Sequence, residues 1–198
     1  MSSGNPVTDA LIVMGQALWF MFPAMTTGSF AVLLGGGAPI DGYRKDKRGV
    51  RLLGDGKSWA GLGWGILGGV SVGTAMVIIR SFAPAEAQEL LTDFTPQGPS
   101  VLGFLGPIIA LCFGSMMGDL LFSFGKRRKG LQRGARAPLV DQLDFVIGSW
   151  LFLLAFYPTW TMHTFRWEQA IAILILIPGI HLLTNVIAYK LGKKKEPW

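Results

Sequence analysis

Residues 101–128 read VLGFLGPIIALCFGSMMGDLLFSFGKRR, an apolar segment that contains one carboxylate and ends in a cluster of cations. A helix crosses the hydrocarbon core of a bilayer in about 20 apolar residues. The rest of the chain has the same character, because 51% of its 198 residues are hydrophobic and 15% are charged. A soluble domain carries about 25% charged residues. The sequence therefore predicts an all-α integral membrane protein and excludes an ordinary water-soluble protein.

Five segments are long and apolar enough, or nearly so, to cross a membrane. We expect one transmembrane catalytic domain over residues 1–198, with spans at about 10–34, 58–79, 101–124, 145–162 and 169–189. Pro158 interrupts the fourth of these spans. No connection is long enough to form a soluble domain with its own core, so a catalytic site has to lie in the helices or their loops.

The basic residues are distributed very unevenly along the chain. Lys and Arg number 18 against 12 Asp and Glu, and 16 of the 18 fall in the first and third connections and the C-terminal tail. Basic connections stay on the cytoplasmic side of a membrane. We therefore expect a multi-pass protein of the cell membrane with an outside N-terminus, two basic cytoplasmic loops, a cytoplasmic C-terminus and a site facing the cytoplasm.

Few residues are available for thiol or imidazole chemistry. Cys112 is the only cysteine, and His163 and His181 are the only histidines. An internal disulfide is excluded, and a zinc site would have too few ligands. In so hydrophobic a chain, the excess of cations indicates membrane orientation rather than nucleic-acid binding. The groups available for catalysis or binding are therefore carboxylates, hydroxyls and the cationic side chains of Lys and Arg.

Asp119 is an ionisable residue inside the third span. A charged group there is energetically costly and marks a functional site by default. The alternative is a carboxylate that reaches the interface or pairs with a nearby Arg. On a helix, Asp119 shares a face with Ser123, and Ser123 shares one with Lys126 and Arg127. This stripe leads from the membrane into the second basic loop.

Asp141 and Asp144 lie at the cytoplasmic start of the fourth span. The spacing of three residues puts both carboxylates on one helical face, where they repel each other unless a cation lies between them. Oxygen ligands of this kind suit Mg²⁺ held together with substrate phosphates. Acids at a helix N-terminus also complement its dipole. The approach of Asp119 from the preceding helix favours the metal-phosphate interpretation.

The first basic loop ends in Gly54-Asp55-Gly56-Lys57-Ser58. Glycines followed by a cation at a helix N-terminus expose N–H groups that attract phosphate. The spacing is not that of a Walker A loop, and Gly-Asp-Gly by itself is most often a turn. In the following span, glycines at every fourth position predict close helix packing. These are Gly61, Gly65, Gly69 and Gly73.

The segment from Gly118 to Phe145 resembles the signature of the CTP-dependent lipid cytidylyltransferases, the CDP-diacylglycerol synthase superfamily. The matching residues are Gly118-Asp119-Leu120, Ser123, Lys126-Arg127, Asp141 and Asp144. Upstream, Pro39-Ile40-Asp41 and residues 54–59 are similar to the archaeal branch of that superfamily. The resemblance implies transfer of CMP from CTP to 2,3-bis-O-(geranylgeranyl)-sn-glycerol 1-phosphate in archaeal membrane phospholipid biosynthesis. The products would be the CDP-activated lipid and pyrophosphate.

The resemblance also implies roles for individual residues. The magnesium ligands would be Asp119, Asp141 and Asp144, and these would act in catalysis with Ser123, Lys126 and Arg127. Substrate-binding residues would be Arg51, Asp55, Lys57, Ser58, Arg128 and Arg133. The expected partners are CTP, an isoprenoid ether lipid phosphate and membrane lipids, with no nucleic acid. The nucleophile is a phosphate monoester with a second pKa of about 6, so it needs no general base.

Two other functions have to be weighed. A CDP-alcohol phosphotransferase also uses clustered aspartates, but its longer motif with further Asp residues and an Ala-Arg pair is absent from this chain. A small transporter or ion channel would favour carboxylates near the bilayer midplane. Here the acids gather at one predicted surface beside basic loops, which disfavours a transport pathway.

Overall fold

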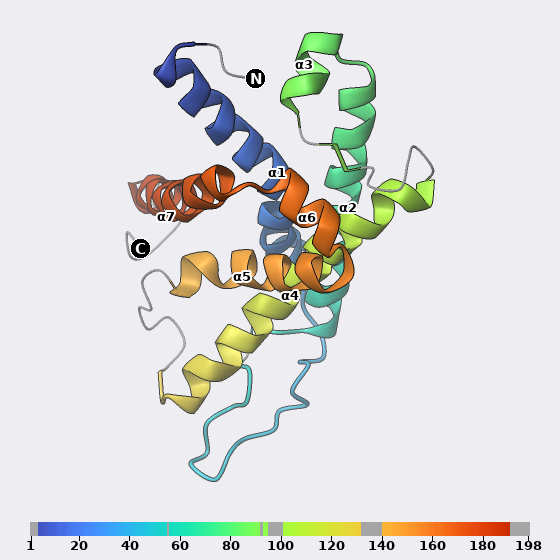
Figure 1. Ribbon diagram of the computed structural model, residues 1–198. Helices are drawn as coiled ribbons and strands as arrows, with labels where there is room; N and C mark the ends of the chain where they lie inside the picture. Colours follow the sequence, from blue (N-terminus) through green and yellow to red (C-terminus); the bar gives the residue numbers. More distant parts are fainter. Residues whose placement is uncertain (1–3, 55, 92, 95–100, 132–139, 191–198) are drawn as a thin grey trace.

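The computed structural model describes residues 4–54, 56–91, 93–94, 101–131 and 140–190. Within these ranges the chain forms seven helices and no β-strand, apart from isolated bridges between Pro39 and Ser58 and between Lys45 and Arg51. The helices, shown in Figure 1, are α1 (Pro6–Leu34), α2 (Trp59–Ser81), α3 (Ala85–Leu90), α4 (Val101–Arg128), α5 (Val140–Phe156), α6 (Pro158–Thr164) and α7 (Trp167–Lys190).

The predicted spans correspond to these helices with one correction. The first, second, third and fifth spans correspond to α1, α2, α4 and α7. The fourth, 145–162, is divided into α5 and α6, which are separated by the non-helical Tyr157. Pro158 has no N–H to donate and disfavours a helical backbone at the residue before it. The proline therefore starts a new helix instead of extending α5.

Within the described part of the chain, three helices are long and apolar enough to cross a membrane, namely α1, α2 and residues 103–128 of α4. Among the residues whose side chains the structure describes, α7 contains a shorter apolar helical stretch, Trp167–Ile180. The short helix α3, in the connection after α2, was not expected from the sequence. The chain is thus a helical membrane protein, whereas the count of five spans and their orientation stay predictions.

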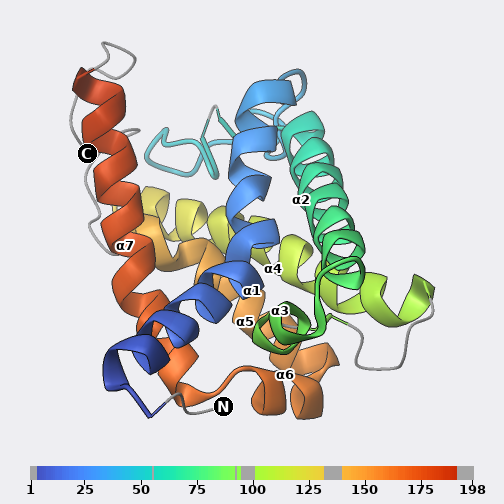
Figure 2. The same ribbon diagram turned by 90° about the horizontal axis from the view of Figure 1, so that it is seen from above.

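The C-terminal half of α1 packs along the N-terminal half of α2, and the two helices diverge beyond this contact (Figures 1 and 2), while α4 packs against both. A Cβ at Gly65 would lie 2.9 Å from the carbonyl oxygen of Thr27, and one at Gly69 would lie 2.9 Å from that of Pro23. The predicted role of the α2 glycines in close packing is confirmed. A buried hydrogen bond of 2.8 Å joins Thr27 Oγ1 on α1 to Ser115 Oγ on α4.

Helices α4 and α5 cross with their backbones in close contact. A Cβ at Gly148 would lie 2.6 Å from the Cα of Gly118, and one at Gly118 would lie 2.2 Å from the carbonyl oxygen of Asp144. Only glycine permits backbones to approach this closely. The crossing therefore fixes the first turns of α5 against the middle of α4, where Asp119 lies.

Helix α7 lies beside α1 (Figure 2), and Gln169 Nε2 donates to Gln16 Oε1 at 3.1 Å between them. Where the chain enters α6 and α7, Phe20 of α1 packs against Phe165, with ring centroids 4.7 Å apart. Phe20 also contacts Phe94 at 5.9 Å and Trp160 at 5.8 Å. This aromatic cluster ties the connection before α4 to the α6–α7 region.

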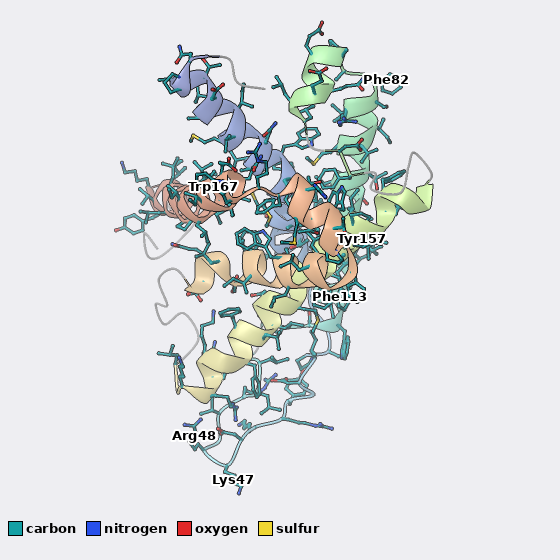
Figure 3. The ribbon with its side chains drawn as sticks, viewed as in Figure 1. Lys47, Arg48, Phe82, Phe113, Tyr157 and Trp167 are labelled. Atoms are coloured by element: carbon teal, nitrogen blue, oxygen red, sulfur yellow. The ribbon has the colours of Figure 1, made fainter. Side chains whose placement is uncertain are left out.

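The loop between α1 and α2 folds back onto the C-terminal end of α4 at the bottom of Figure 1. Arg48 Nη2 donates to the carbonyl oxygen of Arg128 at 2.8 Å, and Arg128 Nη1 lies 3.1 Å from Asp46 Oδ2. Figure 3 shows Arg48 and Lys47 at the tip of this loop, far from Phe82 at the end of α2. The first basic loop therefore lies beside the basic end of α4, as the charge distribution predicts.

Candidate active site

The α4–α5 crossing brings Asp119 and Asp144 together. Asp144 is 5% exposed, and its carboxylate accepts the N–H of Phe145 at 2.7 Å. The Asp119 carboxylate is close enough to repel that of Asp144, while Lys57 and Lys126 are close enough to attract it. Two predicted metal ligands therefore share one polar site, with a predicted phosphate-binding cation on each of two flanking segments.

Two lysine–aspartate pairs flank this site. Lys57 Nζ donates to Asp119 Oδ2, and Lys126 Nζ donates to Asp141 Oδ1. The Lys57 and Asp119 side chains are 23% and 33% exposed. Ion pairs with such access to solvent contribute about 0.2–1 kcal/mol. These pairs hold the charged groups in place, and replacing either lysine by another cation at the carboxylate would cost little free energy.

Asp141 lies at the edge of the site and does not complete a three-carboxylate cluster. Among the described residues, no three His, Cys, Asp or Glu side chains lie close enough together to hold a metal ion. Mg²⁺ in phosphate-transfer sites commonly takes one or two carboxylates together with substrate phosphates. The carboxylates of Asp119 and Asp144 are close enough to interact and fit that donor set, whereas the Asp141 side chain, 42% exposed, lies at the edge of the site.

Ser123 and Arg127 extend the site along α4. Ser123 is buried one turn beyond Asp119. Arg127 Nη1 donates to the carbonyl oxygen of Leu131, and a Cβ at Gly54 would lie 3.3 Å from Arg127 Nε. Gly54 also has a φ of +99°, which disfavours any larger residue. The structure thus places Arg127 against Gly54, whereas Asp55 lies outside the described residues.

Ser58 has a structural role at the start of α2. Its side-chain oxygen accepts the N–H of Gly61 at 3.0 Å as the helix N-cap, and the N–H of Gly36 at 3.1 Å. The prediction that Ser58 opens a helix is confirmed. A buried hydroxyl with two backbone donors fixes the end of α1 to the start of α2, and its predicted contact with substrate stays a prediction.

Asp41 organises the first basic loop. Its side chain is 1% exposed and accepts from Arg51 Nη2 at 2.5 Å and Arg51 Nε at 3.1 Å. The N–H groups of Leu53 and Tyr43 donate to the same carboxylate at 3.1 and 3.2 Å. The hydrogen-bonded Arg51 guanidinium lowers the pKa of Asp41 to about 2. Asp41 belongs to the Pro39-Ile40-Asp41 motif, but the sequence predicted no role for its carboxylate.

Arg51 and Arg128, both predicted to bind substrate, are engaged with protein groups. Arg51 forms the two-point contact with Asp41, and Arg128 pairs with Asp46. The Arg128 guanidinium also lies 5.2 Å from the centroid of the Phe124 ring. These contacts hold the loop on α4. Arg133, the remaining predicted substrate-binding cation, lies outside the described residues.

A hollow of about 390 Å³ lies between the first basic loop and α4. Its lining combines apolar side chains and backbone with one acid and one cation. The lining residues are Ile40, Asp41, Gly42, Arg44, Leu52, Leu53 and Phe124. Phe124 is five residues from Asp119 on α4, a rise of about 7.5 Å. The volume falls in the range of small-molecule pockets.

The fold and this site define a helical membrane protein with a charged polar centre at the basic end of its helices. The CarS-like, CDP-archaeol synthase family model matches residues 10–198. The CDP-archaeol synthase of Methanosarcina acetivorans is 44% identical over 179 residues, which cover 90% of this chain and 100% of that protein. The enzyme of the same name from Halobacterium salinarum is 44% identical over 182 residues, 92% of this chain and 95% of that one.

A solved structure described as an intramembrane enzyme for archaeal membrane lipids biosynthesis has the same fold. The TM-score is 0.66 at 31% identity, over 86% of this chain and 92% of that one. The chain belongs to the CDP-archaeol synthase family. The activity predicted from the motifs, CTP-dependent formation of CDP-archaeol by a cytidylyltransferase, is confirmed. The phosphotransferase and transporter alternatives are thereby set aside.

Proposed function

We propose that CMP transfer takes place at the α4–α5 crossing, where the CTP triphosphate meets the lipid phosphate. The observation that carries the proposal is the placement of Asp119 beside Asp144, with Lys57 and Lys126 next to them. The lipid substrate is 2,3-bis-O-(geranylgeranyl)-sn-glycerol 1-phosphate. Its tails lie along the helices, and its phosphate reaches this polar centre from the membrane.

The reaction joins two polyanions. An oxygen of the lipid phosphate attacks the α-phosphorus of CTP, and the bond from that phosphorus to the oxygen bridging to the β-phosphorus breaks. Pyrophosphate leaves with the bonding electron pair. The attacking phosphate is already largely dianionic, so the site has to supply charge neutralisation and positioning rather than a general base.

Asp119 and Asp144 would hold Mg²⁺ in this site, together with phosphate oxygens of the substrate. The ion, when bound, supplies charge stabilisation to the phosphates in the transition state. Asp141, at the edge of the site, would join this set only after release from Lys126, as Asp119 would have to be released from Lys57. Its role as a third ligand stays a prediction.

Cations from two parts of the chain would bind the phosphates. Lys57 comes from the end of the first basic loop, while Lys126 and Arg127 come from the last turn of α4. Arg127 lies against the turn at Gly54, so the loop and the helix end face the same space. The hollow of about 390 Å³ beside Phe124 would receive the nucleoside, with the triphosphate extending toward Asp119.

The site faces the cytoplasm of the cell membrane in this proposal. The first basic loop and the basic end of α4 lie at the same end of the molecule as Asp119, Asp144 and their lysines. Basic connections stay cytoplasmic, and CTP is available there. The same orientation puts the α6–α7 connection on the outer face.

The test measures pyrophosphate release from CTP by purified protein supplied with the isoprenoid ether lipid phosphate. Asp119→Asn removes the charge at nearly constant size and should slow release by a factor on the order of a hundred or more. Chelation of divalent ions should stop release, and added Mg²⁺ should restore it. Asp93→Asn, at an exposed acid paired with Arg80 outside the site, is the control and should react normally. A folded Asp119→Asn protein with the wild-type rate would contradict the proposal.

A further inference from the structure

We propose that the Lys57 ammonium is an internal counter-ion that occupies Asp119 in the substrate-free enzyme and is displaced when a divalent cation binds. Displacement frees Lys57 to contact the triphosphate. Binding of the divalent cation is thereby coupled to the availability of the Lys57 ammonium for the nucleotide. The inference rests on the proposed function, because it concerns the carboxylates to which that function assigns the metal.

The charge balance at Asp119 requires a nearby cation. This carboxylate lies near that of Asp144, and like charges brought together in a partly buried site require a cation. Lys57 Nζ supplies one directly, because it donates to Asp119 Oδ2. The ammonium also lies close enough to Asp144 to attract it. In this structure Lys57 therefore performs the neutralising role that a divalent ion would perform with substrate bound.

The two cations exclude each other. Mg²⁺ binds a carboxylate oxygen at about 2.0–2.1 Å and requires near-octahedral space around it. An ammonium hydrogen-bonded to the same oxygen occupies part of that shell and repels the ion. Since the Lys57–Asp119 pair is partly exposed, the pair is weak enough to exchange. Metal binding therefore has to overcome a modest competition from Lys57.

Lys57 can leave without movement of its backbone. The N–H of Ile40 donates to the carbonyl oxygen of Lys57 at 2.9 Å, and the N–H of Lys57 donates to the carbonyl oxygen of Gly54 at 3.4 Å. The next residue is the N-cap of α2. The main chain is thus held on both sides, while the four-carbon side chain can rotate. A released ammonium stays beside the Gly54 turn, where Arg127 also lies.

The test is equilibrium Mn²⁺ binding to the full chain in detergent without nucleotide, read as loss of the free-ion electron paramagnetic resonance signal. Lys57→Met should bind Mn²⁺ about fivefold more tightly than wild type, which corresponds to about 1 kcal/mol. Asp119→Asn should bind it more weakly. In the Asp119→Asn background, Lys57→Met should no longer tighten binding, because the competition acts through that carboxylate.

Two further variants separate competition from general effects. Lys47→Met removes a cation at the exposed loop tip (Figure 3) and should leave Mn²⁺ affinity unchanged. Equal tightening by Lys47→Met and Lys57→Met would overturn the inference, since it would reflect net charge alone. Lys57→Gln replaces Lys57→Met if the latter loses its cooperative thermal unfolding transition, with the same expected result.

The remaining outcomes distinguish this inference from the proposed function. If Asp119→Asn loses both turnover and Mn²⁺ affinity while neither neutral Lys57 variant tightens binding, the counter-ion role is wrong and the metal site stands. If Asp119→Asn retains both wild-type turnover and wild-type Mn²⁺ affinity, the proposed site and the inference fall together. Tightening by the Lys57 variants that depends on Asp119 supports both.

Discussion

At the scale of single residues, the site is a set of carboxylates whose partners differ. Asp144 is buried against the α4–α5 crossing, Asp119 is paired with Lys57, and Asp141 is exposed and paired with Lys126. Three acids that look equivalent in a motif therefore have different surroundings. Their substitution should have unequal effects.

Asp144→Asn should reduce the rate of pyrophosphate release more than Asp141→Asn does. The buried carboxylate adjoins Asp119, so its loss should remove several kcal/mol of transition-state stabilisation, or a factor on the order of a hundred in rate. Asp141 lies at the edge of the site, and its loss should cost about tenfold or less in rate. The check is kcat at saturating Mg²⁺ for variants with the wild-type Tm. Equal and large losses would favour the three-carboxylate site predicted from sequence.

Asp41→Asn should destabilise the first basic loop. Arg51 holds the pKa of Asp41 near 2, below the unfolded value of about 3.9. The carboxylate therefore contributes stability, about 2 kcal/mol, that is fully present above pH 3.9 and lost as pH falls through about 2. The substitution should lower Tm at pH 7 and leave little further difference from wild type at pH 2. Thermal unfolding at both pH values is the measurement, and an unchanged Tm at pH 7 would exclude this role.

At the scale of helices, the site depends on how closely α4 and α5 approach. Gly118 meets the backbone of Asp144, and Gly148 meets that of Gly118. A larger residue at either glycine would clash with backbone atoms of the other helix, and no flexible side chain could move aside to make room. The spacing of the helices, rather than the identity of the acids alone, sets the separation of Asp119 and Asp144.

Gly118→Ala should separate these helices and impair both folding and activity. A Cβ there would lie 2.2 Å from the carbonyl oxygen of Asp144, and overpacking of this kind costs about 1–3 kcal/mol. The rate should fall at least tenfold even where the protein remains folded. Gly125→Ala, on the same helix with nothing within 4 Å of the new Cβ, is the matched control. Both variants are compared by Tm and by pyrophosphate release, and equal behaviour would contradict the role of the crossing.

At the scale of the whole molecule, the charge distribution matches the arrangement of the chain. The first basic loop is held on the end of α4 by Arg48 and Arg128, so this loop and the basic end of α4, which are distant in sequence, share one end of the molecule. The acidic connection after α2, which includes Glu86 and Glu89, lies at the other end with α3 (Figure 1).

A reporter fused after Trp198 should be cytoplasmic, and one inserted near Glu89 should be external. The reason is that basic connections are retained on the cytoplasmic side. Paired reporters active only inside or only outside the cell provide the measurement. The reverse result would place the charged site where cytosolic CTP cannot reach it, and would contradict the proposed orientation.

Much of this protein was determined by the sequence alone, through properties that depend on local composition. Apolar length predicted the helices that became α1, α2, α4 and α7, because the bilayer requires about 20 residues per span. The motif from Gly118 to Phe145 identified the enzyme superfamily. Pro158 signalled an interruption, although the sequence did not show that a separate helix, α6, begins there.

Only the tertiary structure decided which charged groups meet. Pairing Lys57 with Asp119, across 62 residues, depends on how the loop docks on α4. Asp144, rather than Asp141, is the neighbour of Asp119 because of the position along α5 at which this helix crosses α4. The roles of Asp41, Ser58 and Arg128 in holding the loop follow from the same docking. Electrostatic and hydrogen-bonding partners are set by distances of a few ångströms in space, and residue order along the chain does not specify those distances.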